Sequence, residues 1–406
     1  MIRQSPPAPN LALIRQYNMP LLLLNIAVIV FFVWTLRIEH GYFVDERGFI
    51  FGRDFVNFWH YGQGAWTGAG ASYYDPLVYN ARLDALIPGH NYPDQLFSYP
   101  PHYMLVAAPF GLLGYHMALA VFTFLGLTLY WFTIVRPFPD APLRIALFVV
   151  PTIAVLVICG QVSAFLAVLL VWIYRTLDTR PVLAGLLIAL LTVKPQIGVL
   201  LPVFLLATGR WRVCVYAGLF SAGFLAVSVA VHGWQAWQDY LTVGISNQSA
   251  TLFQSSPLVL GLMPTVLVDM AVLGASRSGA LMVHALAMAT ALFFMILVIR
   301  RTQDAFLRYA AFLVATFLAT PYLMAYDTLV LGWVMLTLCT RFETDRLDRI
   351  TYRLAMSLCP VGVVLTMFGL PGTPLILALL AVWILKAVPQ ADTVSALDEA
   401  AARAVA

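Results

Sequence analysis

The pair Arg53-Asp54 lies in an aromatic-rich run, FGRDFVNFWHY, that follows the first membrane-length apolar stretch of the chain. A carboxylate that Phe55, Phe58 and Trp59 partly desolvate suits a general base, which takes a proton from a hydroxyl group. Arg53 then either holds the geometry of that carboxylate or binds phosphate. We predict that Asp54 is a catalytic base; the alternative is an interfacial carboxylate that pairs with Arg53.

Two further ionisable residues, Lys194 and Asp327, lie within long apolar runs. A charge there costs about 2.5–3.5 kcal/mol on membrane-insertion scales, so each residue is a functional-site candidate. Lys194 is a compact cation that suits a phosphate leaving group, although a lysine at a helix end also snorkels to lipid headgroups. Asp327 either belongs to the same site or caps or pairs a helix within the bundle.

These residues coincide with breaks in the helical pattern. The breaks are Cys159-Gly160-Gln161, Lys194-Pro195-Gln196 and TPYLMAYD, which ends at Asp327. The short loops between the apolar stretches carry arginine, and the lysine and arginine bias places such loops in the cytoplasm. The breaks then face outside, so Asp54, Gln161, Lys194, Gln196 and Asp327 are expected to share one face. As an alternative, the two glutamines are hydrogen-bonding residues between membrane helices.

The composition defines the class of protein. Hydrophobic residues make up 61% of the 406 residues and charged residues 10%, with a mean hydropathy of +0.85. Soluble domains carry about a quarter charged residues. Many apolar stretches reach or approach the roughly 20 residues that cross a bilayer as a helix. We therefore predict an all-α polytopic membrane protein with about twelve transmembrane helices. The four single cysteines indicate neither disulfides nor a metal site.

The charge pattern also predicts how the chain is divided. A cytoplasmic arm covers 1–18 and a cytoplasmic tail covers 389–406, with one transmembrane domain at 19–388 and outer loops at about 38–98 and 232–278. The first outer loop carries two interfacial helices, with Phe58, Trp59, Tyr61 and Trp66 at the level of the headgroups. The segment Tyr99–Val135 makes one crossing or two; the pattern leaves this open.

Six segments carry a resemblance to a known family: GRDFVNFWHYG, YYDP, FSYPPHYMLVAAPF, GQVSAFLAVLL, LLTVKPQIGVLLP and TPYLMAYDTLVL. In this order they resemble the polyprenol-phosphate-mannose-dependent α-mannosyltransferases of glycosyltransferase family 87, which have the GT-C membrane fold. The resemblance implies an inverting transfer from a β-linked polyprenyl-phosphate sugar, with Asp54 as base and donor phosphate near Lys194. It implies neither a nucleotide sugar, nor a metal, nor another cofactor. Where mycobacterial members carry a histidine-bearing motif, this chain has Tyr322, Tyr326 and Asp327.

The expected function is thus a membrane glycosyltransferase. It moves a hexose, mannose by the resemblance, from a polyprenyl-phosphate donor to a lipid-linked or glycan acceptor at the outer, periplasmic face of the inner membrane, without nucleic acid as a partner. The expected donor-binding residues are Arg53, Gln161, Lys194, Gln196 and Asp327. The expected acceptor or loop contacts are Trp59, Tyr61, His102 and Tyr322.

Two other functions fit parts of the sequence. A transporter or flippase also uses broken helices with charges near the middle of the membrane. An acyltransferase would need a histidine-centred catalytic pair, for which His102 and His116 offer no partner. The acceptor, the sugar and the oligomeric state are left open by the sequence.

Overall fold

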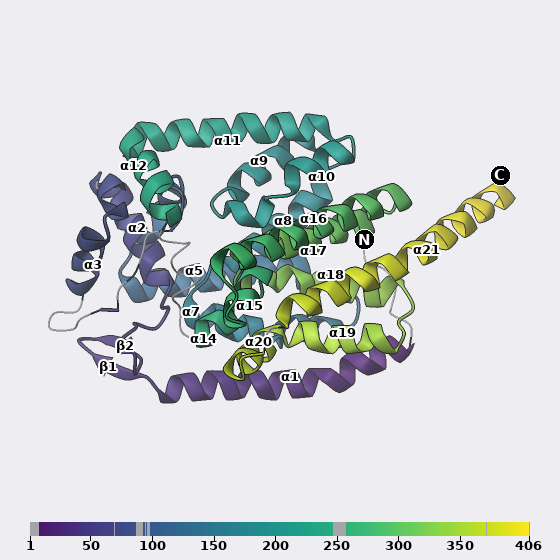
Figure 1. Cartoon of the computed structure of the whole chain (residues 1–406), viewed down its shortest axis with the longest axis horizontal. Helices are drawn as coiled ribbons and strands as arrows, with labels where there is room; N and C mark the ends of the chain where they lie inside the picture. Colours follow the sequence, from purple (N-terminus) through teal and green to yellow (C-terminus); the bar gives the residue numbers. More distant parts are fainter. Residues whose placement is uncertain are drawn as a thin grey trace.

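The protein is a helical bundle with one small β-hairpin. The computed structural model describes residues 8–68, 70–86, 92–93, 95, 98–246, 257–370 and 372–405. Within these ranges, the strands are β1 (Arg37–Glu39) and β2 (Tyr42–Val44), which pair antiparallel. Long helices run side by side along the longest axis of the molecule (Figure 1). The all-α fold is therefore confirmed, with the hairpin as an addition that the sequence pattern did not predict.

In the described part of the chain, five helical segments are long and apolar enough to cross a membrane, or up to seven if each bent pair counts as one. The bent pairs are α6 (Ala141–Phe148) with α7 (Pro151–Cys159), at 42°, and α19 (Arg346–Met356) with α20 (Leu358–Met367), at 80°. The five single segments are Asn10–Trp34, Tyr115–Val135, Trp211–His232, Arg277–Arg301 and Thr373–Ala391. The shorter apolar helices are Ser163–Thr176, Pro181–Leu191, Pro195–Ala207 and Ala305–Ala319. A membrane protein is thus supported, and the count of about twelve crossings stays a prediction.

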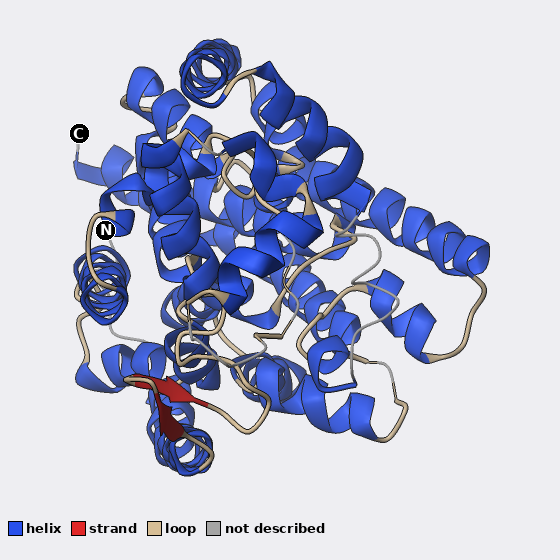
Figure 2. Cartoon of the chain, turned by 90° about the vertical axis from the view of Figure 1, so that its left-hand side faces the viewer, coloured by secondary structure: helices blue, strands red, loops and turns tan. Residues whose placement is uncertain are grey.

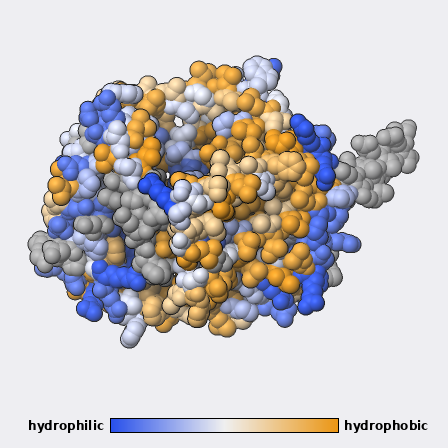
Figure 3. Space-filling model, viewed as in Figure 1, coloured by the Kyte–Doolittle hydropathy of each residue, from blue (hydrophilic) through white to orange (hydrophobic). Residues whose placement is uncertain are grey.

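The surface agrees with a membrane environment. Hydrophobic residues form a broad band across the middle of the molecule, and hydrophilic residues gather towards its two ends (Figure 3). Large apolar side chains face outwards on the long helices, including Phe31, which is 67% exposed, and Phe124, which is 74% exposed. Because lipid tails are as apolar as these side chains, such a surface is stable inside a bilayer.

The first helix begins earlier than the sequence pattern predicted. α1 runs from Ala8 to Trp34, so most of the expected polar arm at 1–18 is helical, and residues 1–7 lie outside the described part. Asn10 is buried and its amide donates to the Cys339 carbonyl at 3.0 Å, which fixes this end of α1 to the bundle. At the other terminus, α21 (Thr373–Val405) continues through the segment that was predicted as a separate tail from Pro389.

The predicted interfacial helices exist, but the first lies inside the protein. α2 (Phe55–Thr67) packs on α4 (Tyr103–Gly111) so closely that a Cβ on Gly62 would lie 2.4 Å from the Ala107 carbonyl oxygen. Phe58, Trp59 and Tyr61 are consequently buried, and of the four predicted headgroup aromatics only Trp66 is exposed. The headgroup prediction was wrong for the other three because α2 packs against α4. α3 (Pro76–Asp84) buries Tyr79 and Leu83 alone.

The segment left open, Tyr99–Val135, contains one membrane-length helix. α4 has 9 residues and includes Pro109, which is too short to span. α5 (Tyr115–Tyr130) continues into the π-helical turn η2 (Trp131–Val135) and qualifies by length and composition. The structure thus favours one crossing here.

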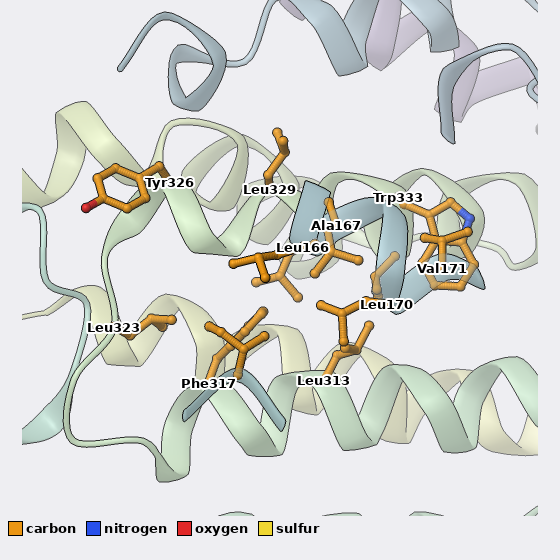
Figure 4. Packing of buried hydrophobic residues seen from close by; sticks show 14 of the residues in the cluster. Leu166, Ala167, Leu170, Val171, Leu313, Phe317, Leu323, Tyr326, Leu329 and Trp333 are labelled. Carbon is orange, nitrogen blue, oxygen red and sulfur yellow. The ribbon is translucent and has the colours of Figure 1, made fainter. Parts of the chain in front are cut away.

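Three buried helices form the centre of the bundle. α8 (Ser163–Thr176) presents Leu166 and Leu170 to Leu313 and Phe317 of α17 (Ala305–Ala319), and α18 (Val330–Arg341) completes the packing with Trp333 (Figure 4). The remaining elements are α9 (Pro181–Leu191), η3 (Pro195–Gly198), α10 (Leu201–Ala207), α11 (Trp211–His232), α12 (Trp234–Asp239), η4 (Tyr240–Gly244), α14 (Pro257–Gly261), α15 (Val266–Val272), α16 (Arg277–Arg301), η5 (Ala325–Leu329) and η1 (Gly70–Tyr74).

One end of the bundle carries α2, α3, α12 and the hairpin, and we call it the loop end; Figure 2 views the molecule from this side. Parts of both predicted outer loops, at 87–91 and 247–256, lie outside the described residues. α16 ends at Arg301, and an ion pair between Arg341 and Asp304 joins the end of α18 to the start of α17. α14 and α15 are too short to span.

Candidate active site

The backbone around Asp54 is fixed to the end of α7. The Gly52 amide donates to the Ile158 carbonyl at 3.1 Å, and the Asp54 amide donates to the Cys159 carbonyl at 3.0 Å. These carbonyls are among the last of α7, which have no partner within the helix. Gly52 has a φ of +87°, a conformation that glycine adopts without strain. The segment before α2 therefore uses unpaired helix carbonyls to place Asp54 beside the break after α7.

Gly160 both ends α7 and allows α2 to approach it closely. Its φ is +64°, and the Gln161 amide donates back to the Leu156 carbonyl at 3.0 Å, which closes the helix end. A Cβ on Gly160 would lie 2.5 Å from the Cβ of Phe55. Only a glycine thus permits both the left-handed turn and the close approach of α2, and the turn directs Gln161 towards Asp54.

The two carboxylate oxygens of Asp54 have different surroundings. Oδ2 accepts a hydrogen bond from Gln161 Nε2 at 2.5 Å. Oδ1 has no hydrogen-bond partner among the described residues. Asp54 occupies the N-cap position of α2, yet its side chain makes no capping hydrogen bond. An ordinary capping role therefore does not explain this aspartate, and one oxygen is left to accept a proton.

Desolvation by burial raises the pKa of Asp54 above its ordinary value. The hydrogen bond from Gln161 and the charges of Lys194 and Arg53 oppose this shift, and the negative charge of Asp327 adds to it. A carboxylate with a raised pKa holds a proton more strongly than an ordinary aspartate. Asp54 is thus a stronger base than its residue type alone provides.

A hydrogen-bonded network leads from Asp54 into the bundle. Gln161 Nε2 also donates to the Tyr326 hydroxyl oxygen at 3.0 Å, and Lys194 Nζ lies 5.3 Å from the centre of the Tyr326 ring. Lys194 in turn donates to both carboxylate oxygens of Asp327, each at 2.7 Å. Three chain breaks, after α7, after α9 and before α18, therefore meet at one place.

Asp327 is the most completely paired residue of this network. Besides Lys194, it accepts from the Ser163 hydroxyl at 2.8 Å and from the Met324 amide at 3.3 Å. The side chains of both Asp327 and Lys194 are almost fully buried. A buried ion pair is strongly destabilising when one partner is removed. The Asp327 carboxylate therefore holds Lys194 and the η5 turn in place.

The structure thus joins four of the five residues that were expected to share a face: Asp54, Gln161, Lys194 and Asp327. Gln196, on η3, is half-buried and has no hydrogen-bond partner among the described residues. Pro195 begins η3 between Lys194 and Gln196, and no described hydrogen bond joins the Gln196 side chain to the network.

Arg53 does not pair with Asp54. Its guanidinium group forms an ion pair with Asp45, and it lies 5.5 Å from the ring centre of Phe32 and 5.2 Å from that of Phe49. The alternative in which Asp54 is an interfacial carboxylate paired with Arg53 is therefore wrong. The Nε atom of Arg53 is buried without a partner in the described residues, so this side chain keeps a free donor.

The predicted aromatic contacts lie in the protein interior. Trp59 Nε1 donates to the Leu113 carbonyl at 2.8 Å. Tyr61 is buried, with ring centres 5.9 Å from Tyr79 and 6.3 Å from Tyr103. Both side chains therefore pack the α2–α4 region, and neither offers a surface to an acceptor.

The other two predicted acceptor or loop contacts, His102 and Tyr322, lie in different parts of the protein. His102 is buried, with Nε2 3.2 Å from the Thr192 hydroxyl and its ring stacked on Trp237 at 5.5 Å. Burial lowers the pKa of His102 to about 4, so the imidazole is neutral near pH 7. Tyr322 is half-buried in the break before η5, in the same segment as Tyr326 and Asp327.

Two residues of the network were absent from the predicted site, Tyr326 and Ser163. Both stand next to predicted residues in the sequence: Tyr326 precedes Asp327, and Ser163 follows Gln161 by two positions. The signal that would have found them is the break itself, because both residues lie within two positions of a predicted site residue at a break in an apolar run.

An apolar groove begins beside Lys194. It has a volume of about 280 Å³ and lies between α9, the η3–α10 segment and α11. Pro195, Pro202 and Gly218 are exposed, so the groove reaches the surface of the bundle. Its lining is Ile188, Leu191, Thr192, Pro195, Gly198, Leu201, Pro202, Leu205, Cys214, Ala217, Gly218 and Ser221.

Comparison with known proteins identifies the family. Residues 97–321, more than half of the chain, match glycosyltransferase family 87. The chain therefore belongs to this family, and the protein is a membrane glycosyltransferase. No curated protein and no solved structure matches the chain. Gln161 and Lys194 lie inside the matched range, whereas Asp54 and Asp327 lie outside it and join the site through their contacts.

Proposed function

We propose that the protein transfers mannose from a β-linked polyprenyl-phosphate donor to a hydroxyl group of a lipid-linked or glycan acceptor, with inversion, at the outer face of the membrane. The observation that carries this proposal is the carboxylate of Asp54: Gln161 donates to Oδ2, and no described residue donates to Oδ1. A single base is what a one-step inverting transfer needs, because the attacking hydroxyl loses one proton as the bond to the sugar forms.

The reaction is a direct displacement at the anomeric carbon of the donor sugar. The acceptor hydroxyl donates to Asp54 Oδ1 and attacks the anomeric carbon, its proton passes to the carboxylate, and the bond from that carbon to the phosphate oxygen breaks. The negative charge grows on the leaving phosphate. A cation beside that phosphate therefore stabilises the transition state more than the ground state.

Lys194 supports a phosphate donor. A lysine ammonium has three N–H donors, and Asp327 takes two of them at 2.7 Å. The third is left for a phosphate oxygen, and the ion pair with Asp327 keeps the ammonium in place. The unpaired Arg53 Nε offers a second donor near Asp54. In this proposal Asp327 positions Lys194 and does not itself bind the donor.

The apolar groove supports a lipid-linked donor. Thr192 and Pro195, which flank Lys194, belong to its wall, so a phosphate at Lys194 places an attached hydrocarbon chain at the start of the groove. Burial of apolar surface contributes about 25 cal/mol per Å². A nucleotide sugar would leave this apolar groove without a matching group.

The test supplies purified protein in lipid with radiolabelled polyprenyl-phosphate mannose or with nucleotide-activated mannose, together with a lipid extract. We expect label to move into an acceptor from the polyprenyl donor alone, and Asp54→Ala to abolish the transfer. Asp75→Asn is the matched control, because Asp75 only caps α3 in the same outer segment and asparagine also caps. Transfer from the nucleotide sugar alone, or unchanged transfer by Asp54→Ala, would overturn the proposal.

A further inference from the structure

The orientation of the Gln161 amide follows from its neighbours. An ionised carboxylate only accepts hydrogen bonds, so the amide atom that lies 2.5 Å from Asp54 Oδ2 is the donor Nε2. The second hydrogen of Nε2 goes to the Tyr326 hydroxyl oxygen at 3.0 Å. Both amide hydrogens of Gln161 are therefore used within the protein.

Two groups are left unused by this arrangement. Gln161 Oε1 is buried and has no hydrogen-bond partner in the described part of the chain, although the residue is only 5% exposed. The Tyr326 hydroxyl accepts from Gln161, so its own hydrogen is available, and no described residue receives it. Figure 4 shows this hydroxyl at the edge of the apolar cluster, directed away from Leu166 and Leu329. A buried acceptor without a donor costs about 1–3 kcal/mol, so such a group calls for a partner.

We propose that Gln161 Oε1 and the Tyr326 hydroxyl together bind one ring hydroxyl of the sugar that is transferred. A hydroxyl both donates and accepts, so it satisfies the free carbonyl oxygen and the free phenolic hydrogen at once. A phosphate oxygen or a carbonyl only accepts, and an ammonium only donates, so each would leave one group unpaired. This inference rests on the proposed function and names the part of the donor that the site recognises.

The location supports the donor sugar as the source of this hydroxyl. The Lys194 ammonium lies over the Tyr326 ring, 5.3 Å from the ring centre. The sugar of the donor is bonded to the phosphate that Lys194 is proposed to bind, so this sugar lies near Tyr326. The attacking hydroxyl of the acceptor is excluded, since it gives its proton to Asp54 Oδ1. Gln161 thus positions the base with its Nε2 atom and binds the substrate with its Oε1 atom.

The experiment measures kcat/KM with polyprenyl-phosphate mannose and with a set of donors that each lack one ring hydroxyl. We expect the wild-type protein to use one of these deoxy donors at least about tenfold less well, because the missing hydroxyl leaves two buried groups unpaired. Tyr326→Phe and Gln161→Met should each lose about tenfold with the full donor and discriminate much less against that same deoxy donor.

Tyr309→Phe is the matched control, because it removes another buried hydroxyl, one that donates to the Leu170 carbonyl at 2.8 Å. It should keep the wild-type ratio between donors. Wild-type discrimination in both Tyr326→Phe and Gln161→Met would overturn the inference, as would a change seen only with deoxy acceptors. Absence of any transfer from polyprenyl donors by the wild type is a different result, which overturns the proposed function and this inference with it.

Discussion

Asp54 and Asp327 belong to one network, but their surroundings satisfy them to different degrees. Asp327 accepts from Lys194 with both oxygens, from Ser163 and from the Met324 amide. Among the described residues, Asp54 accepts from Gln161 alone. The first carboxylate has little capacity left for a ligand, whereas the second keeps one oxygen free.

In the proposed mechanism, this difference separates the structural acid, Asp327, from the reactive acid, Asp54. Both residues are acidic, both lie among apolar side chains, and each was a site candidate on those grounds. Burial and charge therefore do not by themselves identify the base. The unused acceptor capacity of Asp54 is what supports it as the proposed base, because a proton can be taken only by an oxygen that is not already committed to fixed donors.

The largest expected effect is on catalysis at Asp54. Asp54→Asn should lower the rate of transfer by about 10²–10⁴-fold, because the amide cannot take a proton. The unfolding temperature in detergent should change little, since one hydrogen bond is at stake. Initial rates with radiolabelled donor and a thermal melt measure the two quantities. If the variant keeps more than about a tenth of the rate, Asp54 is not the base.

Asp327→Asn should show the opposite balance, with a larger effect on stability than on the rate of transfer. It leaves the buried Lys194 ammonium without a counter-charge and should lower the free energy of unfolding by about 3–5 kcal/mol. The double variant Lys194→Met with Asp327→Leu should recover much of this loss, because an apolar pair needs no compensation. Denaturation in detergent checks both. Full stability of the single variant would show that the ion pair does not hold the breaks together.

The pH dependence gives a smaller effect that concerns Asp54 alone. The base acts when it is deprotonated, so activity should fall as the pH drops through its pKa. Burial raises that pKa, which places the acid limb of the rate profile above the range of an ordinary aspartate, near 4. Gln161→Met removes a hydrogen bond that lowers the pKa, so the limb should move further up. An unchanged limb would show that Gln161 does not contact the base.

The smallest expected effect is at Ser163. Ser163→Ala removes one of the donors to Asp327 and should lower the free energy of unfolding by about 1–2 kcal/mol, less than Asp327→Asn because Lys194 stays paired. The acid limb of the rate profile should stay at its wild-type position, because Ser163 contacts Asp327 and not Asp54. A shifted limb would show that Ser163 acts on Asp54 as well as on the fold.

Local sequence determined the class of the protein and the places where its helices break. Apolar composition required helices in a membrane, since unpaired backbone groups are costly there. Gly160 and Pro195 ended their helices by their own backbone preferences. Asp54 and three of its predicted neighbours could therefore be placed at one site from residue types, breaks and arginine placement, and the family match agrees with the resemblance of the motifs.

Tertiary structure alone decided which of these residues pair with which. Arg53 is next to Asp54 in the sequence but bonds to Asp45, and Lys194 lies 133 positions from its partner Asp327. The burial of α2 against α4 likewise depends on the contact between Gly62 and Ala107. Residue types fix the hydrogen-bonding and charge capacity of each group. Which capacity is already used, and which is left for a substrate, depends on distances between segments that only the folded chain brings together.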